Sequence, residues 1–448
     1  MRMHPGKLML AVWGLLVVAY VVLPFRSVER EFNLLGIVSL AIFITAFVFG
    51  TLVPGRRRNP AHPSQRLRGV FCDASRAERV LMLVSGAAVL FLLLDIRGKS
   101  IFDLALTYEL RSEAAGALLN AEASQSSTWF QLAFLLYPAG YVYAVLHLMF
   151  AERLSGMRLA VFGLLPVGLA TLAMGGRVPL FYWALCAFLA WRVRRHRLVA
   201  GHPLLLPLSP IQRRGMVSGV AVFVAAMTYY FAVVFFVRAQ VAGGAAEMFE
   251  LAESRWGIAF DGALSGPIFA VLGPDVAYLL FVFVWYLVQG LVMSTFLFSA
   301  YDGPMQFGIY GVDLVSAVMR RASPELVASG FADLLSMNVL GFLPSAFGSL
   351  YVDFGYFGVL ICFAWGMLAA LVHRRIRAGN DERWLVFGPI VTLGILFSVI
   401  NTPIGFTNGL MTHFWLFVAF LLLRRRPAAT VVAPVVVGAP LGPAASTA

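Results

Sequence analysis

Residues that could take part in chemistry gather at the edges of long apolar runs. Asp353 stands in the stretch LPSAFGSLYVDFGYFGVLI, residues 343–361, where Tyr351 precedes it and an apolar run follows. We expect Asp353 to occupy the first turn of a helix that begins near Tyr351, where the helix dipole keeps an acid ionised. An acid stabilised in this way is a modest base, so Asp353 is predicted to orient a hydroxyl group.

A tight turn holds the next candidate, Arg177. In AMGGRVPLFYW, residues 173–183, paired glycines suit the end of one helix and Pro179 suits the first turn of the next. The incoming helix would direct its N-terminal amides towards Arg177, which predicts an anion site. The alternative is that Arg177 only reaches out to lipid headgroups.

Arg238, Arg255 and His413 are weaker candidates. Arg238 closes an apolar run in FFVRAQ, and Arg255 follows in ESRWG. An unpaired arginine at membrane depth costs about 3 kcal/mol, so such a residue reaches the interface or pairs with an anion. Together with Arg177, these arginines could form a cationic pocket. His413, about a turn into the last apolar run, is a candidate base, with a packed, hydrogen-bonded histidine as the alternative.

Motifs for other chemistries are absent from the sequence. There is no HExxH, no GxxxxGK[ST], no GxSxG and no CxxC pair, and its 3 cysteines give no disulfide framework. The sequence therefore predicts a site without metal or cofactor.

The composition indicates the elements that must position these residues. The 448 residues are 60% hydrophobic and 12% charged, which is typical of a polytopic membrane protein. The net charge of +12 comes from arginines clustered after apolar runs, so nucleic-acid binding is not expected. The apolar runs that approach the length of a membrane span are 8–25, 32–54, 80–96, 128–150, 159–174, 178–192, 215–237, 351–372, 384–400 and 409–423.

Four arginine clusters predict the orientation. They lie within 56–79, 192–214, 374–377 and 424–426, and all fall on one side if both termini are cytoplasmic and the first span is uncleaved. Counting Val276–Phe298 as a simple span would break this pattern. We therefore expect that run to be interfacial, re-entrant or laterally packed, with residues 238–349 essentially on the outer face.

These features together predict an all-α polytopic membrane protein with about 10 to 12 transmembrane helices. Residues 1–426 are expected to form a single polytopic membrane domain that includes a long helical outer segment at about 238–350. Residues 427–448 are Pro/Ala/Val-rich and are expected to form a disordered cytoplasmic tail.

Four motifs carry a family resemblance. The GGRxP turn at Arg177, YLVQG at 286–290, FGIYGVD at 307–313 and YVDFGYFG at 351–358 resemble the O-antigen and exopolysaccharide polymerases of the oligosaccharide repeat unit polymerase (Wzy-type) family. The resemblance implies a GT-C-like glycosyltransferase at the periplasmic face of the bacterial inner (cytoplasmic) membrane. It would join undecaprenyl-diphosphate-linked oligosaccharide repeat units, working beside a flippase and a chain-length regulator in the lipid bilayer.

The resemblance also suggests roles for the candidate residues. Arg177 and Arg238 would contact the diphosphate leaving group, with Arg255 assisting, because cations stabilise its developing charge. Asp353 would position the acceptor hydroxyl or a partner arginine, and Tyr351 and His413 would bind substrate.

Other functions remain open at this level. A transporter or flippase of lipid-linked saccharide would carry polar groups near the midplane, whereas here they collect at helix ends. An O-antigen ligase would differ only in its acceptor. A non-catalytic membrane scaffold would leave the outer arginines unexplained.

Overall fold

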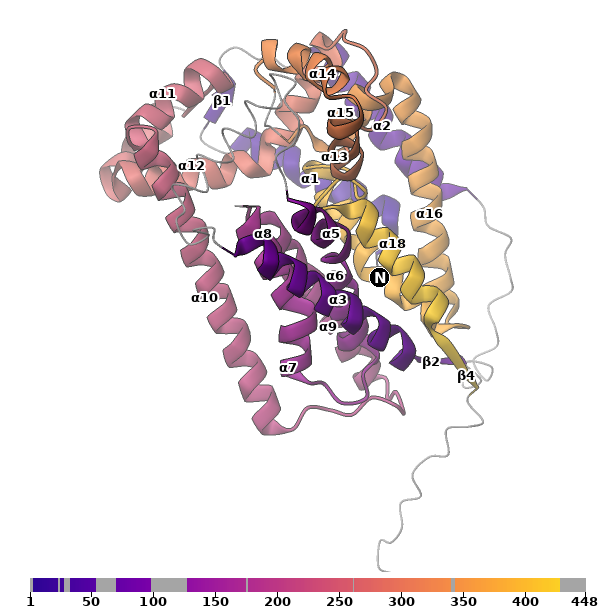
Figure 1. The fold of residues 1–448 in the computed structure, drawn as a ribbon. Coiled ribbons are helices and arrows are strands. Elements are labelled where there is room, and N and C mark those ends of the chain that lie inside the picture. The colour runs from indigo at the N-terminus through magenta and orange to yellow at the C-terminus, as the bar shows by residue number, and fades with distance from the viewer. Residues whose placement is uncertain are drawn as a thin grey trace, which may run out of the picture.

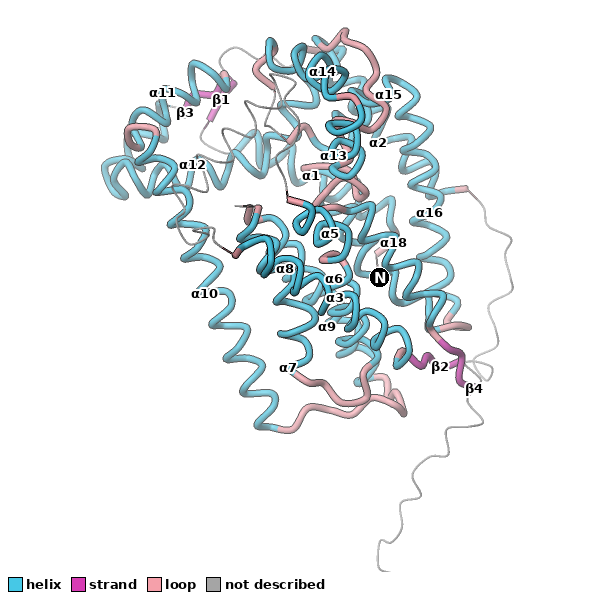
Figure 2. The backbone as a smooth tube through the Cα atoms, viewed as in Figure 1, coloured by secondary structure: helices cyan, strands magenta, loops and turns pink. Residues whose placement is uncertain are grey.

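The computed structural model describes residues 3–22, 25–27, 33–53, 70–97, 127–174, 176–260, 262–339 and 343–427. Helices dominate this part of the chain, and the strands form two short pairs (Figure 2). The expected tail at 427–448, apart from its first residue, Pro427, lies outside what is described, as do the side chains of Arg238 and Arg255.

The helices of the described residues are numbered in chain order. Their bounds are α1 Pro5–Val22, α2 Leu34–Leu52, α3 Ser75–Ile96, α5 Thr128–Leu136, α6 Ala139–Phe150, α7 Gly156–Arg158, α8 Leu165–Ala173, α9 Val178–Val199, α10 Pro210–Val241, α11 Ala245–Trp256, α12 Gly262–Ala300, α13 Asp313–Ala322, α14 Pro324–Ser336, α15 Ser345–Phe354, α16 Gly358–Ala378, α17 Phe387–Leu396 and α18 Gly409–Leu422. The strands are β1 Phe25–Ser27, β2 Val70–Asp73, β3 Ile258–Phe260 and β4 Arg424–Pro427, with β1 antiparallel to β3 and β2 antiparallel to β4.

Nine helical segments within the described residues are long and apolar enough to cross a membrane. All but one coincide with expected spans, and the addition is Gly266–Ala300 in α12. Two expected spans are not among them, because α9 carries arginines in its last turns and α18 is a shorter apolar helix. The chain is thus an all-α, multi-pass membrane protein.

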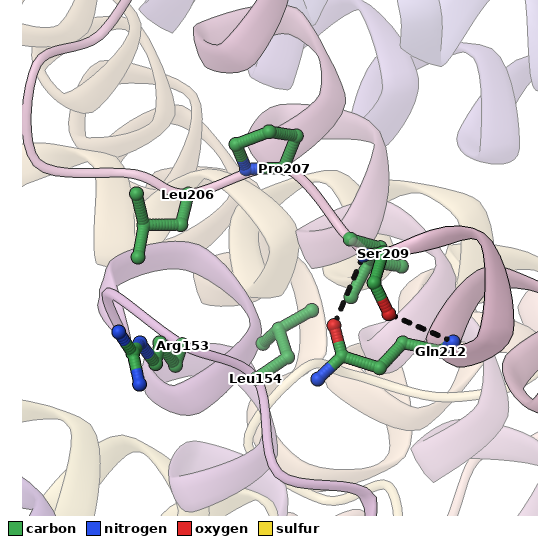
Figure 3. Close-up of a pocket in the computed structure, with 7 residues that line it drawn as sticks. Arg153, Leu154, Leu206, Pro207, Ser209 and Gln212 are labelled. Atoms are coloured by element: carbon green, nitrogen blue, oxygen red, sulfur yellow. Dashed lines mark hydrogen bonds between the residues drawn. The ribbon is translucent and has the colours of Figure 1, made fainter.

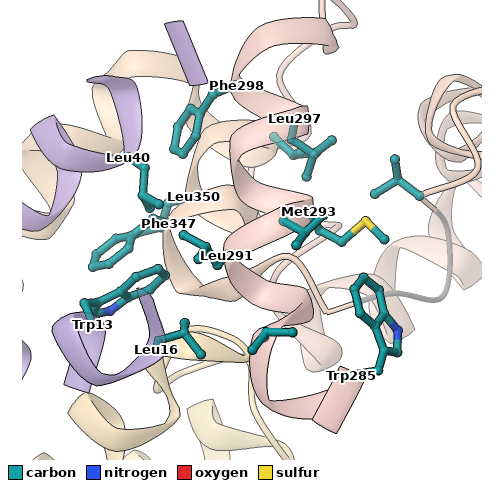
Figure 4. Close-up of a cluster of buried hydrophobic side chains, with 14 of the residues drawn as sticks. Trp13, Leu16, Leu40, Trp285, Leu291, Met293, Leu297, Phe298, Phe347 and Leu350 are labelled. Carbon is teal, nitrogen blue, oxygen red and sulfur yellow. The ribbon is translucent and has the colours of Figure 1, made fainter. Parts of the chain in front are cut away.

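Two hydrophobic cores build the bundle. The first joins α1, α2, α12 and α15, with Trp13, Leu40, Phe298 and Phe347 facing one another (Figure 4). The second joins α3, α6, α9 and α18. Because α17 contributes residues to both, it links the two halves.

Helices α2 and α16 touch backbone to backbone. A Cβ added to Gly50 would collide with the carbonyl oxygen of Phe363, and one added to Gly366 would collide with that of Phe47. Small residues allow this close approach between helices in a membrane. The two helices run parallel, and Arg374 near the end of α16 donates to the carbonyl of Val53, which follows α2, at 2.9 Å.

Members of the arginine clusters meet at one end of the bundle, called here the basic end. Arg197 pairs with Glu382 at 2.7 Å, and Arg425 on β4 pairs with Asp381 at 3.0 Å. Strand β4 lies beside β2, which precedes α3 (Figure 1). We expected these clusters to lie on one side of the membrane, and this arrangement agrees with that. Which compartment the basic end faces stays a prediction.

The start of the expected span at Tyr351 was wrong. Helix α15 ends at Phe354, and Gly355 (φ 53°, ψ −142°) breaks the chain before α16 begins at Gly358. Asp353 therefore lies in the last turn of α15, where the helix dipole is negative and does not stabilise an acid. The apolar sequence on both sides of Gly355 hides this break.

The segment between α10 and α15 is helical, as expected, but part of it is core. Helix α12 is kinked at Gly273 (φ 73°) and its C-terminal part packs beside α15, where Ser294 and Ser345 lie 2.6 Å apart. In Figure 1, α11 and the start of α12 project at the upper left of the bundle. This lateral packing is one of the arrangements expected for Val276–Phe298, and whether that run crosses the membrane stays a prediction.

Candidate functional site

Arg177 occupies the turn that the sequence indicated. It precedes α9, and Pro179 lies in the first turn of that helix. The Arg177 side chain is buried, and its guanidinium carbon lies 3.8 Å from the ring centroid of Phe235 on α10. This cation–π contact fixes Arg177 inside the protein, so it does not simply reach out to lipid. Arg238 follows Phe235 by three residues, so these two positions share one face of α10.

His413 and Tyr351 make local structural contacts. His413 Nδ1 donates to the carbonyl oxygen of Gly409, one turn earlier in α18, at 2.8 Å. The Tyr351 hydroxyl donates to the carbonyl of Tyr301 at 3.5 Å, and its ring packs 4.8 Å from that of Phe298. These contacts agree with the alternative of a packed histidine and give Tyr351 a role in joining α12 to α15.

Asp353 holds a loop. Its side chain is 2% exposed, and its two carboxylate oxygens accept the backbone N–H groups of Tyr310 at 3.0 Å and Gly311 at 2.8 Å. The Asp353 carbonyl also accepts the N–H of Phe307 at 2.9 Å. Backbone amides thus supply the stabilisation that the helix dipole cannot give here. Asp353 anchors residues 307–312, the FGIYGV part of the motif FGIYGVD.

The anchored loop is pressed between two elements. A Cβ on Gly311 would lie 2.6 Å from Oδ2 of Asp353, and a Cβ on Gly405 would collide with the Gly311 carbonyl. Thr402 donates its hydroxyl to that same carbonyl at 3.5 Å. The loop is therefore fixed between α15 and the segment that leads into α18.

Asp313 follows directly from this loop as the first residue of α13. Its Oδ2 accepts the backbone N–H of Asn408 at 3.3 Å, just before α18. The Asp313 side chain keeps contact with solvent. The protein packed around it nevertheless raises its pKa to about 6, although the Asn408 hydrogen bond and the Arg320 charge act to lower this pKa. A carboxyl group that titrates near neutral pH is suited to exchange protons.

Polar groups lie on the same helix face as Asp313 and beside the Asn408 N–H that it accepts. Ser316 and Arg320 follow it at positions that share one face of α13. The Asn408 side chain is 1% exposed and donates Nδ2–H to the carbonyl of Phe134. Among the described residues, Asn408 Oδ1, Ser316 Oγ, Thr407 Oγ1 and Arg320 Nε are buried without a hydrogen-bond partner. We name Asp313, Ser316, Arg320, Thr407 and Asn408 the Asp313 site; buried polar atoms of this kind normally bind water or a ligand.

The backbone of the Asp313 site is also unusual. Thr407 and Asn408 have φ values of 51° and 56°, a left-handed conformation that side chains other than glycine adopt at a cost. The Tyr137 hydroxyl supports this turn by donating to the carbonyl of Thr407 at 3.1 Å. Strain maintained by surrounding contacts is common at functional sites.

Sequence reasoning missed the Asp313 site. Asp313 closes the motif FGIYGVD, but as one charge in a polar segment it resembles a solvated surface acid. A signal was available, since Asp313, Ser316 and Arg320 recur at helical spacing on one face of a strongly amphipathic segment. The contact with Asn408, 95 residues away, could not be read from the sequence.

The Asp313 site and the basic end lie at opposite ends of α18. That helix starts beside Asp313 and runs down to β4 at the basic end (Figure 1). Its length separates the two regions by about 20 Å at 1.5 Å per residue.

A surface pocket opens at the basic end (Figure 3). Two residues of its lining hydrogen-bond to each other. The Ser209 N–H donates to Gln212 Oε1 at 3.1 Å, and the Gln212 N–H donates to Ser209 Oγ at 3.2 Å. It has no acid in its lining. This pocket therefore offers no acid–base chemistry comparable to the Asp313 site.

Comparisons with protein-family models, curated proteins and solved structures give no match for this chain. The fold and the site define an all-α, multi-pass membrane protein with charged pairs at its basic end and the Asp313 site at the opposite end of α18. The resemblance to the Wzy-type polymerases stays a prediction.

Proposed function

We propose that the protein is a membrane glycosyltransferase that joins undecaprenyl-diphosphate-linked oligosaccharide repeat units into O-antigen or exopolysaccharide. The observation that carries this proposal is the separation of charges along the bundle. Arginine clusters meet at one end, and the Asp313 site lies at the other end of α18. By the positive-inside rule the basic end is cytoplasmic, so the Asp313 site faces the periplasm of a bacterial inner membrane, with both termini in the cytoplasm.

This placement suits two lipid-anchored substrates. The reacting sugars lie just outside the membrane, where a site at helix ends can reach them without a separate soluble domain. The leaving diphosphate carries negative charge, which arginines such as Arg177 and Arg238 stabilise as it develops. On this proposal the scaffold is GT-C-like and the protein works with a flippase and a chain-length regulator.

Arg177 provides the first test. In a producing strain that lacks the gene, wild-type protein should restore a ladder of long polymer. Arg177→Ala should restore only single lipid-linked repeat units at unchanged protein level, and Arg192→Ala, near the basic end, should behave as wild type.

The outcomes separate the candidate functions. Normal chain lengths from Arg177→Ala would remove that residue from the site. Repeat units trapped on the cytoplasmic side of the membrane in the strain lacking the gene would identify a flippase instead. Purified protein that forms polymer from lipid-linked repeat units would support the polymerase directly.

A further inference from the structure

We propose that Asp313 is the catalytic base of this glycosyl transfer and that Arg320, on the same face of α13, binds the donor diphosphate. The inference rests on the proposed function and names the groups that would perform it. In this assignment Asp353 is a positioning residue that acts through the loop.

The two acids differ in what their oxygens already bind. Both carboxylate oxygens of Asp353 accept backbone N–H groups, and the side chain is 2% exposed. Asp313 commits Oδ2 to the Asn408 N–H, while its Oδ1 accepts no hydrogen bond from the described residues and the side chain contacts solvent. A base must reach the proton it accepts, so Asp313 is suited to the role and Asp353 is not.

Arg320 supplies the positive charge. Its side chain is half-buried, and Nε has no hydrogen-bond partner within the described part of the chain. Its charge attracts that of Asp313, but the two form no direct ion pair among the described residues. Seven residues separate them along the helix, a backbone rise of about 10 Å, and the two positions share one face of α13.

Neighbouring groups complete a site for a saccharide. Asn408 Oδ1 and Ser316 Oγ are buried and without partners among the described residues, so hydroxyl groups of a sugar could satisfy them. The titratable or charged groups that act on Asp313 are Arg320 on α13 and Tyr137, which precedes α6. The site therefore combines one acid, one cation and neutral hydrogen-bonding groups.

The transfer balances as a single displacement. The acceptor hydroxyl oxygen bonds to the anomeric carbon of the donor, and the bond from that carbon to the diphosphate oxygen breaks. The lipid diphosphate leaves with the bonding electrons, and on this proposal Arg320 adds its charge to that of Arg177 and Arg238 in stabilising it. The hydroxyl proton passes to the Asp313 carboxylate and then to solvent.

The experiment compares Asp313→Asn and Asp313→Glu with Asp302→Asn, an exposed acid in a nearby loop that serves as the control. Purified variants in liposomes receive the lipid-linked oligosaccharide fraction extracted from the producing strain. Asp313→Asn should lose about 100-fold or more of the polymerisation rate, which is the scale of general-base catalysis. Asp302→Asn should match wild type, and Asp313→Glu should keep part of the rate with a shifted acid limb in its pH profile.

Each other outcome has a defined meaning. Polymerisation by Asp313→Asn at the wild-type rate would overturn the assignment. If Asp313→Asn does not accumulate in the membrane, the pH profile of Asp313→Glu decides, and an acid limb identical to that of wild type would overturn it. Wild-type protein that makes no polymer would instead reject the proposed function, and the inference with it.

Discussion

The backbone N–H of Gly311 lies 2.8 Å from Oδ2 of Asp353, so the end of α15 holds a loop whose next helix begins two residues later at Asp313. This contact links the most distinctive motif of the sequence to the site that the sequence did not reveal. Asp353 can therefore be essential for activity without touching substrate.

Asp353→Asn should loosen this loop. The asparagine amide has one oxygen that can accept a hydrogen bond and one NH₂ group that cannot, so one of the two backbone N–H groups loses its acceptor. This loss should lower the free energy of unfolding by about 1–3 kcal/mol. A lowered unfolding temperature in detergent would report the loss. Asp302→Asn is the control, and an unchanged unfolding temperature for Asp353→Asn would contradict the anchoring role.

The close contact of α2 and α16 should not tolerate bulk. Gly366→Leu should push the helices apart, because even a Cβ at this position would overlap the Phe47 carbonyl. We expect reduced accumulation and a lower unfolding temperature. Gly86→Leu on α3, where a Cβ would meet nothing within 4 Å, is the matched control. Equal stability of the two variants would argue against this packing.

Phe235 should matter through Arg177. Phe235→Leu removes the aromatic ring that the Arg177 guanidinium contacts. The lost cation–π interaction should be worth about 0.5–2 kcal/mol. Polymer formation should fall, whereas Phe235→Tyr, which keeps a ring, should preserve it. Full activity of Phe235→Leu would show that the ring does not position Arg177.

The basic end should lose stability in acid. Burial alone would raise the pKa of Asp381, but hydrogen bonds and charge from Arg383, together with the charge of Arg425, lower it overall. A carboxyl group with a lowered folded-state pKa stabilises the fold above its unfolded pKa of about 4, and this contribution disappears as the pH falls through the folded value. Unfolding temperatures of wild type and Asp381→Asn, measured against pH, should converge in acid. Curves that stay parallel would contradict this.

Cysteine labelling should establish sidedness. The native cysteines Cys72, Cys186 and Cys362 are buried, so background labelling should be low. Ala300→Cys, exposed at the end of α12, should react with an impermeant maleimide in intact cells whose outer membrane has been permeabilised. Ser209→Cys, near the basic end, should react only after the inner membrane is opened. The reverse pattern would invert the proposed orientation.

The sequence predicted helices well where apolar runs were long and bounded by arginine, as in α2, α3 and α16, because hydrophobic length is a local property. It also located the Arg177 turn, since glycine and proline have local meanings. It failed at Gly355, where one residue with positive φ divides an apolar run whose composition does not change.

The Asp313 site was hidden for a different reason. Its character depends on Asn408, which reaches Asp313 only through tertiary packing. An isolated acid at the start of an amphipathic helix gives no sign that a distant backbone N–H will hold one of its oxygens. Burial and hydrogen bonding, which set its proton affinity, become visible only in three dimensions.

The packing of α2 against α16 has a consequence for biosynthesis. Gly50 emerges early from the ribosome, but the backbone that fills its groove begins at Gly358. During most of translation α2 must wait in the lipid with this small-residue surface uncovered, while the later helices are inserted one after another. This contact can therefore form only after the chain has been synthesised to the end of α16 at Ala378, and chains truncated before that point should be substrates for membrane proteases.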